Sequence, residues 1–366
     1  MIRACTFFLV VMAFTLRGAE TNVVEKPHVV AVIGAAGERQ YGEIFANWAM
    51  RVKDAAKTAG AEFTLIGVGE LGEKKDGELL KESLTSLKSE SQQELWLVLI
   101  GHGTYNGREA KFNLRGPDVT AKQIDEWLKP LKRPVAIINC ASSSGPFLDR
   151  LKGRDRVIIS ATKSGGEQNF ARFGDFFTDA LSDMSADLDK DEQVSLLEMF
   201  ITASKGAYGH YDNIGKLATE HALIDDNGDG LGSRAEWFRG VRATKRASNG
   251  KSLDGYRAHQ LHLIRSEFET NLSPELRAER DRLEMSLNRH RERKKRMKEK
   301  LYYSQLEMIL VQIGEIYQQA EKAMAKKAEA KVEEKPDKPS PKPKKPTESK
   351  KKPAPAKAEA KAKVAK

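Results

Sequence analysis

Cysteine is nearly absent from this chain, whose 366 residues include only Cys5 and Cys140. A small scaffold held together by disulfides is therefore excluded. Long apolar runs are also missing: no internal run reaches the roughly 18 residues that a membrane-spanning helix needs, which excludes a polytopic membrane protein. Hydrophobic residues make up 40% of the chain and charged residues 31%, so a collagen-like, fibrous or wholly disordered chain is excluded as well.

Acidic residues are scarce in two C-terminal stretches, which account for the net charge of +10. Residues 331–366 contain 13 Lys and 5 acidic side chains, and residues 289–300 contain 8 basic and 2 acidic side chains. The remainder of the chain is net acidic. The basicity therefore belongs to C-terminal appendages, and the sequence does not indicate a globular body that binds nucleic acid.

The N-terminus has the pattern of a secretory signal peptide over residues 1–19. Arg3 supplies the positive charge, Ala4–Leu16 form an apolar stretch, and Gly18-Ala19 offers small residues for cleavage. Arg17 departs from the pattern, because a small residue is preferred at that position. The alternative is an uncleaved anchor, which the shortness of the stretch disfavours. We therefore expect an exported protein, periplasmic or extracellular, that retains one cysteine.

Short apolar runs alternate with amphipathic segments over residues 27–184. The runs are continuous and rich in Val, Ile and Leu, as in strands buried on both faces; they are His28–Ile33, Glu62–Val68, Leu95–Ile100, Pro134–Ile138 and Arg156–Ser160. Helices are predicted at Tyr41–Ala59, Asp76–Lys88, Thr120–Leu128 and Gly145–Leu151, the third with Thr120 as its N-cap. This alternation predicts an α/β domain with a mostly parallel sheet and helices on both faces.

The remaining cysteine and a histidine are predicted at the same edge of this sheet. Gly101-His102-Gly103 follows the third run, and Asn139-Cys140 follows the fourth. Ligands of open parallel sheets bind beyond the carboxyl ends of the strands. A thiolate is a nucleophile, and an imidazole can take the thiol proton and later give it to a leaving amine. The amides of Gly103 and Cys140 are candidate donors to the developing oxyanion.

The surroundings of Cys140 leave two interpretations. Gly145 and the small residues before it suit a tight turn into a helix, whose positive end would favour a thiolate. The alternative is an inert core cysteine with an incidental histidine, because free cysteine is commonly buried. The joint placement of His102 and Cys140 favours the first. We therefore predict a cysteine endopeptidase with a Cys140–His102 dyad, and a catalytically silent calcium-binding scaffold of the cell envelope as the alternative.

This arrangement resembles the caspase–hemoglobinase clan, which includes legumains, caspases, metacaspases and gingipains. The resemblance rests on a strand that ends in His102-Gly103 and a later strand that ends in Cys140 before a turn of small residues. It covers roughly residues 28–182 and implies a caspase-like fold that hydrolyses a peptide or protein substrate. Gly101 stands where legumains have an acidic residue, and Asn139 is neutral where metacaspases carry an aspartate. Cleavage specificity therefore stays open.

The segment after the fifth run, Ala161–Glu167, resembles the legumain segment that lines the first specificity pocket. The resemblance implies four substrate-binding residues: Ser160, Thr162, Lys163 and Glu167. Lys163 and Glu167 suit solvated loop positions equally well, so both interpretations stay open.

Two acidic stretches within residues 185–245 have the spacing of EF-hand loops, with ligands at positions 1, 3, 5, 7, 9 and 12. The first set is Asp187, Asp189, Asp191, Gln193 (backbone), Ser195 and Glu198. The second set is Asp225, Asn227, Asp229, Leu231 (backbone), Ser233 and Glu236. Glu192 replaces the turn glycine of the first loop, which costs about 1–2 kcal/mol. Either stretch alone suits an acidic surface loop, but together they predict structural Ca²⁺, whereas no cofactor is expected for catalysis.

The C-terminal third is predicted to be helical over residues 256–324, with a turn at Ser273-Pro274, and disordered over residues 325–366. A heptad seam, formed by Leu306, Leu310, Ile313, Tyr317 and Ala320, predicts either an antiparallel pair or an oligomerising coil within residues 276–320. The basic tail suits contact with an anionic envelope polymer or lipid, or a solvated spacer. Sequence-specific nucleic-acid binding is not expected, because the last 36 residues contain no aromatic side chain to stack on bases.

Overall fold

The structure is a computed structural model that describes residues 26–333, with side chains described for residues 26–326. The predicted signal peptide and the tail beyond residue 333 lie outside the described residues. Within the described part, no helix combines the length and the apolar character needed to cross a bilayer.

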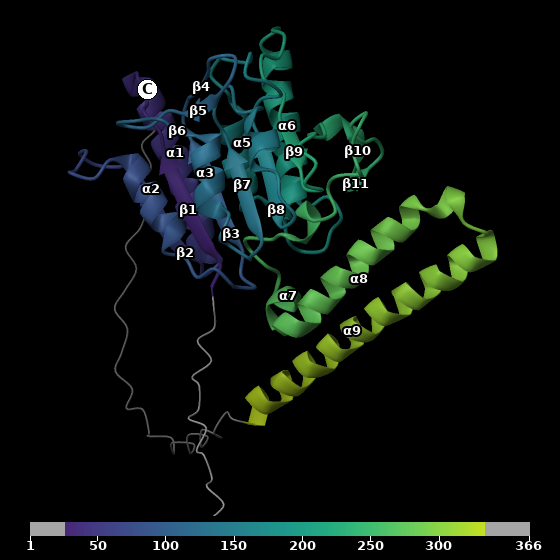
Figure 1. The fold of residues 1–366 in the computed structure, drawn as a ribbon. Coiled ribbons are helices and arrows are strands. Elements are labelled where there is room, and N and C mark those ends of the chain that lie inside the picture. The colour runs from purple at the N-terminus through teal and green to yellow at the C-terminus, as the bar shows by residue number, and fades with distance from the viewer. Residues whose placement is uncertain (1–25, 334–366) are drawn as a thin grey trace, which may run out of the picture. The chain divides into compact units, whose positions relative to one another are not determined.

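One six-stranded sheet forms the centre of the fold, in the order β2-β1-β3-β7-β8-β9 (Figure 1). The strands are β1 (His28–Ile33), β2 (Glu62–Ile66), β3 (Leu95–Ile100), β7 (Val135–Asn139), β8 (Arg156–Ser160) and β9 (Leu223–Asp225). The first five are parallel, and β9 pairs antiparallel with β8. The predicted mostly parallel sheet is confirmed.

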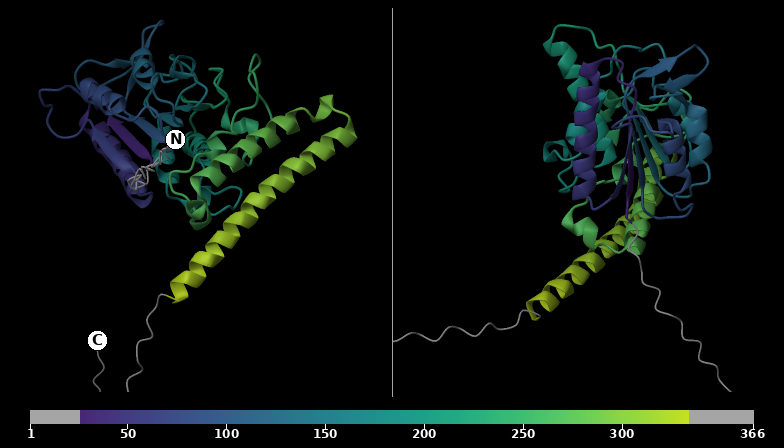
Figure 2. Two further views of the ribbon diagram at one scale, coloured as in Figure 1. Left: turned by 60° about the horizontal axis from the view of Figure 1, so that its bottom comes forward. Right: turned by 90° about the vertical axis from the view of Figure 1, so that its left-hand side faces the viewer.

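Helices cover both faces of the sheet (Figures 1 and 2). One face carries α1 (Arg39–Thr58), α5 (Phe173–Ala180) and α6 (Leu196–Asn213), and the other carries α2 (Asp76–Thr85), α3 (Ala121–Leu128) and α4 (Phe147–Leu151). Alternate residues of β3 enter the two cores, Trp96 on the α1 side and Leu97 on the α2 side. Thr120 caps α3 as predicted, because its hydroxyl accepts a hydrogen bond from the amide of Gln123 at 3.1 Å.

Several short elements have no clear pattern in the sequence. A three-stranded antiparallel sheet follows His102, formed by β4 (Gly103–Tyr105), β5 (Ala110–Phe112) and β6 (Val119–Thr120). A two-stranded ribbon consists of β10 (Phe238–Arg239) and β11 (Arg242–Ala243). The 3₁₀ turns within residues 26–333 are η1 (Met184–Ala186), η2 (Ala235–Trp237), η3 (Ala258–Gln260) and η4 (Lys294–Arg296).

The C-terminal helices are α7 (Glu267–Asn271), α8 (Pro274–Glu292) and α9 (Glu299–Glu333), and α8 and α9 form an antiparallel hairpin. Helix α9 continues into the segment predicted to be disordered. The predicted turn at Ser273-Pro274 is present, with Ser273 as the N-cap of α8. The buried residues of α9 include Ile316 and Ala320, whereas Leu310 is 45% exposed. Ala320 of the predicted heptad seam is therefore packed whereas Leu310 is not, and oligomerisation through residues 276–320 stays a prediction.

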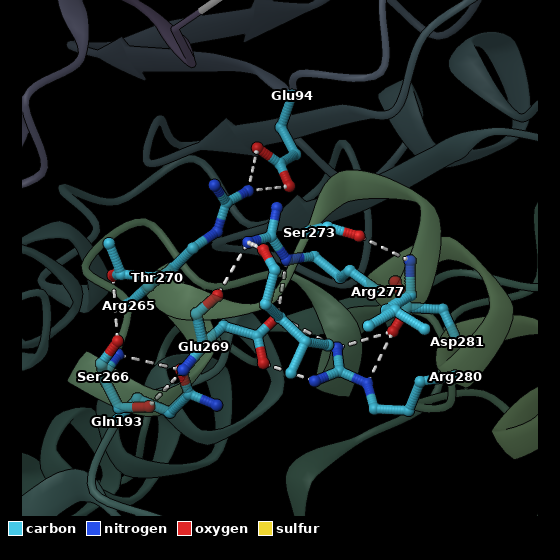
Figure 3. A network of polar contacts seen from close by, with 12 residues as sticks. Glu94, Gln193, Arg265, Ser266, Glu269, Thr270, Ser273, Arg277, Arg280 and Asp281 are labelled. Carbon is cyan, nitrogen blue, oxygen red and sulfur yellow. Dashed lines mark hydrogen bonds and ion pairs between the residues drawn. The ribbon is translucent and has the colours of Figure 1, made fainter. Parts of the chain in front are cut away.

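A buried ionic network ties the start of this hairpin to the sheet domain (Figure 3). Glu269 of α7 accepts hydrogen bonds from Arg277, at 2.8 Å, and from Arg280. Arg265 reaches Glu94, at the start of β3, with contacts of 2.6 and 2.8 Å. A buried charge is tolerated only when it is paired in this way, so these contacts neutralise the buried charges where the hairpin meets the sheet domain.

Candidate functional site

His102 and Cys140 leave neighbouring strands at the same edge of the sheet. β3 and β7 pair in parallel, with Leu99 opposite Asn139, so the residues that follow them share the carboxyl edge. Cys140 belongs to the core on the α1 side, and the His102 ring contacts aromatic rings of α1. The sequence predicts this placement of the two strand ends, and the side-chain environments decide what chemistry it allows.

The Cys140 side chain is completely buried. Gly174 of α5 lies so near that a Cβ there would stand 2.9 Å from the Cys140 Cβ and 2.4 Å from the Trp48 ring. Burial raises the pKa of the thiol, and the nearby Glu220 carboxylate raises it further. The nucleophilic form of cysteine is the thiolate. The prediction that the turn at Gly145 favours a thiolate is therefore wrong.

His102 lies half-buried in an aromatic cluster at this edge. Its ring centroid is 4.8 Å from that of Tyr41, 5.2 Å from Phe45 and 6.0 Å from Phe170. Burial lowers the pKa of His102, and a hydrogen bond with the backbone of Ala36 opposes that shift. Within residues 26–326, no hydrogen bond joins this ring to the Cys140 sulfur, and the pKa shifts of the two groups have other causes. The imidazole therefore has no hydrogen bond to the proposed nucleophile.

The predicted oxyanion donors are already engaged. The Gly103 amide donates to the Ser142 hydroxyl at 3.2 Å, and the Cys140 amide donates to the Leu99 carbonyl at 2.9 Å. A Cβ at Gly103 would lie 2.3 Å from the Ser142 carbonyl oxygen, so this glycine permits close backbone packing. The prediction that these two amides face a substrate is wrong, because the sheet and the turn after β7 use both.

Ser160 and Thr162, two of the predicted substrate-binding residues, are fully buried. The Ser160 hydroxyl donates to the Thr162 carbonyl at 2.9 Å. The Thr162 hydroxyl accepts from the Gly145 amide at 3.1 Å and lies 3.2 Å from the Ser144 hydroxyl. These hydroxyls hold the loop after β8 against the turn after β7, so they do not face a substrate as the resemblance implies.

Lys163 and Glu167, the other two, form a polar cluster with His221. The Glu167 carboxylate lies 3.2 Å from the Lys163 Nζ and 2.6 Å from the His221 Nδ1. It also accepts hydrogen bonds from the backbone amides of Lys163 and His221, at 2.9 and 3.1 Å. The charge of Lys163 is therefore neutralised within the chain. No local spacing in the sequence pointed to His221, because it enters from the segment before β9.

The first acidic loop, residues 187–198, contains the turns that the EF-hand pattern predicts. The Asp187 carboxylate accepts hydrogen bonds from the amides of Lys190 (2.6 Å) and Glu192 (3.2 Å). Glu192 has a φ of 69°, so it adopts the left-handed conformation that the consensus glycine supplies. Carboxylate oxygens of Asp187, Asp189 and Asp191 lie within 4.8 Å of one another. This donor set fits a hard divalent cation, although calcium itself stays a prediction.

The second acidic loop, residues 225–236, repeats these turns position by position. The Asp225 carboxylate accepts from the amides of Gly228 (3.1 Å) and Gly230 (3.0 Å), which have φ values of 72° and 79°. In both loops the carboxylate at position 5 accepts from the amide at position 7: Asp191 from Gln193 at 3.2 Å, and Asp229 from Leu231 at 2.8 Å. The two stretches therefore share one local backbone design.

Glu198, at position 12, closes the first loop. Its carboxylate accepts hydrogen bonds from the amides of Leu188 and Asp189, at 2.7 and 3.3 Å, and from the Ser195 hydroxyl at 2.7 Å. Its side chain is almost fully buried. Positions 2, 3 and 9 of the loop are thus held by the carboxylate at position 12.

Asp254, rather than Glu236, has this role in the second loop. The Glu236 side chain is 67% exposed and pairs with Arg234. The Asp254 carboxylate accepts from the amides of Asp226 and Asn227, at 3.2 and 3.3 Å, and from the Ser233 hydroxyl at 2.6 Å. These donors again occupy positions 2, 3 and 9. The prediction for Glu236 is therefore wrong, and sequence reasoning missed Asp254 because it lies beyond the motif.

Comparisons with known proteins identify no family for this chain. No family model matches the sequence, and no curated protein matches it. Among solved structures, the crystal structure of the Drosophila initiator caspase Dronc matches with a TM-score of 0.37 and 13% sequence identity. The match covers 64% of this chain and 96% of that chain. Similarity this distant says nothing of activity.

Proposed function

We propose that this chain is a catalytically silent, calcium-stabilised protein of caspase-like fold that acts by binding a partner. One observation carries the proposal: Cys140 is fully buried in the core, and this burial raises the pKa of its thiol. A cysteine peptidase needs a thiolate that a substrate can reach, beside a base that takes its proton. His102 lies at the same edge but has no hydrogen bond to the sulfur.

Calcium is proposed as a structural ion of the two acidic loops. Asp187, Asp189 and Asp191 would hold it in the first loop, and Asp225 and Asp229 would contribute to the second. Burial raises the pKa of Asp225 to about 6, which reflects the cost of negative charge in that loop. A divalent cation would offset this cost, because it supplies the opposite charge at the same place.

The calcium proposal predicts a shift in thermal unfolding. Addition of Ca²⁺ at 10 to 100 times its dissociation constant should stabilise the protein by about 1.4–2.7 kcal/mol. The measurement is the midpoint of thermal unfolding in Ca²⁺ and in a chelator. Asp187→Asn and Asp225→Asn should each reduce the shift, and Asp54→Asn, at an exposed carboxylate on α1, is the matched control. An identical midpoint with and without Ca²⁺ would contradict the proposal.

A second candidate function is the predicted cysteine endopeptidase. It is favoured by the aromatic cluster that both residues border: Phe170 lies 6.0 Å from His102 and 5.9 Å from Trp48, and Trp48 contacts Gly174 beside Cys140. Catalysis would require α5 to move away from the sulfur. The same fold would then bring an imidazole and a thiol to one edge of the sheet.

Labelling of Cys140 distinguishes the two functions. The silent protein should not react with a peptide that carries a thiol-reactive group until it is unfolded, and His102→Ala should behave identically. Cys140→Ser, which lacks the thiol, is the negative control for labelling. Labelling of the native protein that disappears in His102→Ala would overturn the silent assignment and support the endopeptidase, because only an activated thiolate depends on its base.

Export is proposed on the signal-like pattern of residues 1–19. Sequencing the N-terminus of the chain recovered outside the cytoplasm tests it. A chain that begins at residue 20 is expected, and a chain that stays in the cytoplasm with residue 1 intact would contradict it.

A further inference from the structure

The tip of the helical hairpin carries uncompensated positive charge. We define the tip as residues 289–303, which include the end of α8, η4 and the first turn of α9. Eight basic side chains of the tip are exposed. Lys294 bonds the Tyr303 hydroxyl at 3.3 Å. The other seven make no ion pair within residues 26–326, namely Arg289, Arg291, Arg293, Lys295, Arg296, Lys298 and Lys300. The tip therefore presents these positive charges to solvent, where an anionic surface can pair with them.

Apolar side chains emerge beside these charges. Leu301 is 50% exposed and Tyr303 is 47% exposed. The Tyr303 ring packs edge-on against Tyr302 at 5.2 Å, and Tyr302 stacks on His290 at 4.6 Å, which fixes the aromatic pair to the end of α8. The Lys294 Nζ lies 5.3 Å from both tyrosine rings. Basic side chains around exposed tyrosine and leucine are typical of surfaces that lie in a membrane interface.

A groove between α8 and α9 adjoins the tip. Its volume is about 510 Å³, and its lining includes Arg282, Ser286, Arg289, Arg293 and Gln305. Among the described residues, no acidic side chain lines it. Arg282 pairs with Glu279 outside the groove, which leaves two guanidinium groups to bind an anion. A guanidinium group binds a phosphate through two parallel hydrogen bonds to its oxygens. The groove therefore fits a phosphate-bearing headgroup.

We propose that the hairpin tip docks on a membrane surface that contains anionic phospholipid. Arg289 and Arg293 bind a headgroup phosphate in the groove, while Leu301 and Tyr303 enter the interface. A nucleic acid would use the charges and stack on Tyr303, but it offers no apolar partner to the exposed aliphatic side chain of Leu301. The combination of unpaired arginines with exposed apolar side chains therefore favours lipid. This inference does not depend on the proposed function of the sheet domain.

Vesicle sedimentation tests the proposal with the whole chain. The vesicles are phosphatidylcholine alone, or phosphatidylcholine mixed with phosphatidylglycerol. The wild-type chain should bind the anionic vesicles about tenfold more tightly. Arg289→Ala/Arg293→Ala should reduce this binding about tenfold. Leu301→Ser/Tyr303→Ser should weaken it and make the remainder fully reversible by salt, because only electrostatic attraction is left.

The matched control is Lys53→Ala/Lys57→Ala, which removes the same charge from exposed positions on α1. This variant should bind like the wild type, and all variants keep the same N-terminus and basic tail. Equal loss in the control and in Arg289→Ala/Arg293→Ala would overturn the proposal, as would unchanged binding of both tip variants with unchanged thermal unfolding. Complete displacement from vesicles by a single-stranded RNA of equal phosphate concentration would assign the tip to nucleic acid instead.

Discussion

The two acidic loops have the same turns but obtain their closing carboxylate from different places. In residues 187–198, α6 begins at Leu196, so its first turn carries Glu198 back over the loop. In residues 225–236, only the three-residue turn η2 follows, Glu236 points to solvent, and Asp254 closes the loop. The comparison teaches that the spacing of the motif specifies the turns, while the element that follows decides which carboxylate closes them.

The largest test of this comparison removes the closing carboxylates. Glu198→Ala and Asp254→Ala should each lower the free energy of unfolding by about 3 kcal/mol, because each leaves buried donors without an acceptor. Glu236→Ala should change it by less than about 0.5 kcal/mol, as expected for an exposed side chain. Urea unfolding in a chelator measures all three. Equal losses in Glu236→Ala and Asp254→Ala would break the comparison.

Asp254→Asn sharpens the same test. It keeps the size of the side chain and one oxygen that can accept from the Asp226 and Asn227 amides. Asp254→Asn should therefore lower the free energy of unfolding by less than Asp254→Ala does. A loss as large as that of the alanine variant would mean that the charge of Asp254, rather than its accepting oxygens, holds the loop.

A smaller effect concerns the left-handed residue at position 6. Glu192→Gly should raise the free energy of unfolding by about 1 kcal/mol, because glycine adopts a φ of 69° without strain. Gly230→Ala should lower it by at least as much, since a Cβ there would lie 2.9 Å from the Asp149 Cα. Thermal unfolding measures both. A loss of stability in Glu192→Gly would show that the Glu192 side chain itself stabilises the first loop.

The smallest effect is the pH dependence that the His259–Asp189 pair should give to the first loop. His259 lies 2.8 Å from Asp189. Burial lowers the pKa of His259, whereas the hydrogen bond to Asp189 and the charge of Asp189 raise it. The net effect is a raised pKa of His259. The hydrogen bond from His259 in turn lowers the pKa of Asp189. The stabilisation by His259 is complete below its ordinary pKa of 6.5 and is lost as pH rises through the raised value.

Between about pH 6 and about pH 8, the free energy of unfolding of the wild type should therefore fall by about 0.5 kcal/mol more than that of His259→Gln. The difference is small because the pair is partly exposed. Urea unfolding in a chelator measures the difference. Asn227 occupies the equivalent position of the second loop and does not titrate, so Asn227→Ala should leave the pH slope unchanged. Identical slopes in the wild type and His259→Gln would show that this pair does not distinguish the loops.

The sheet was predictable because its strands are buried on both faces. The runs His28–Ile33, Leu95–Ile100 and Arg156–Ser160 coincide with β1, β3 and β8. β4 and β5 were not predictable, because each has three residues, too few to show a period. β9 has three residues as well and pairs antiparallel with β8, a partner that no local pattern indicates.

The candidate site was predictable only in part. The common edge of His102 and Cys140 follows from the parallel order of β3 and β7. The burial of the sulfur depends on Trp48 from α1 and Gly174 from α5, two residues far from Cys140 in the chain. A sequence pattern contains no information on how closely such distant segments pack, which is why a catalytic thiolate was predicted where the structure has a core thiol.

The sequence by itself determined the five parallel strands of the central sheet and the turns of both acidic loops, because apolar runs and bonds between residues up to five positions apart are local properties. Only the tertiary structure decided that Cys140 is enclosed, that Asp254 replaces Glu236, and that the basic tip of the hairpin has no acidic partner within the described part of the chain. Each of these depends on which distant segments meet, and the packing of the whole fold sets that.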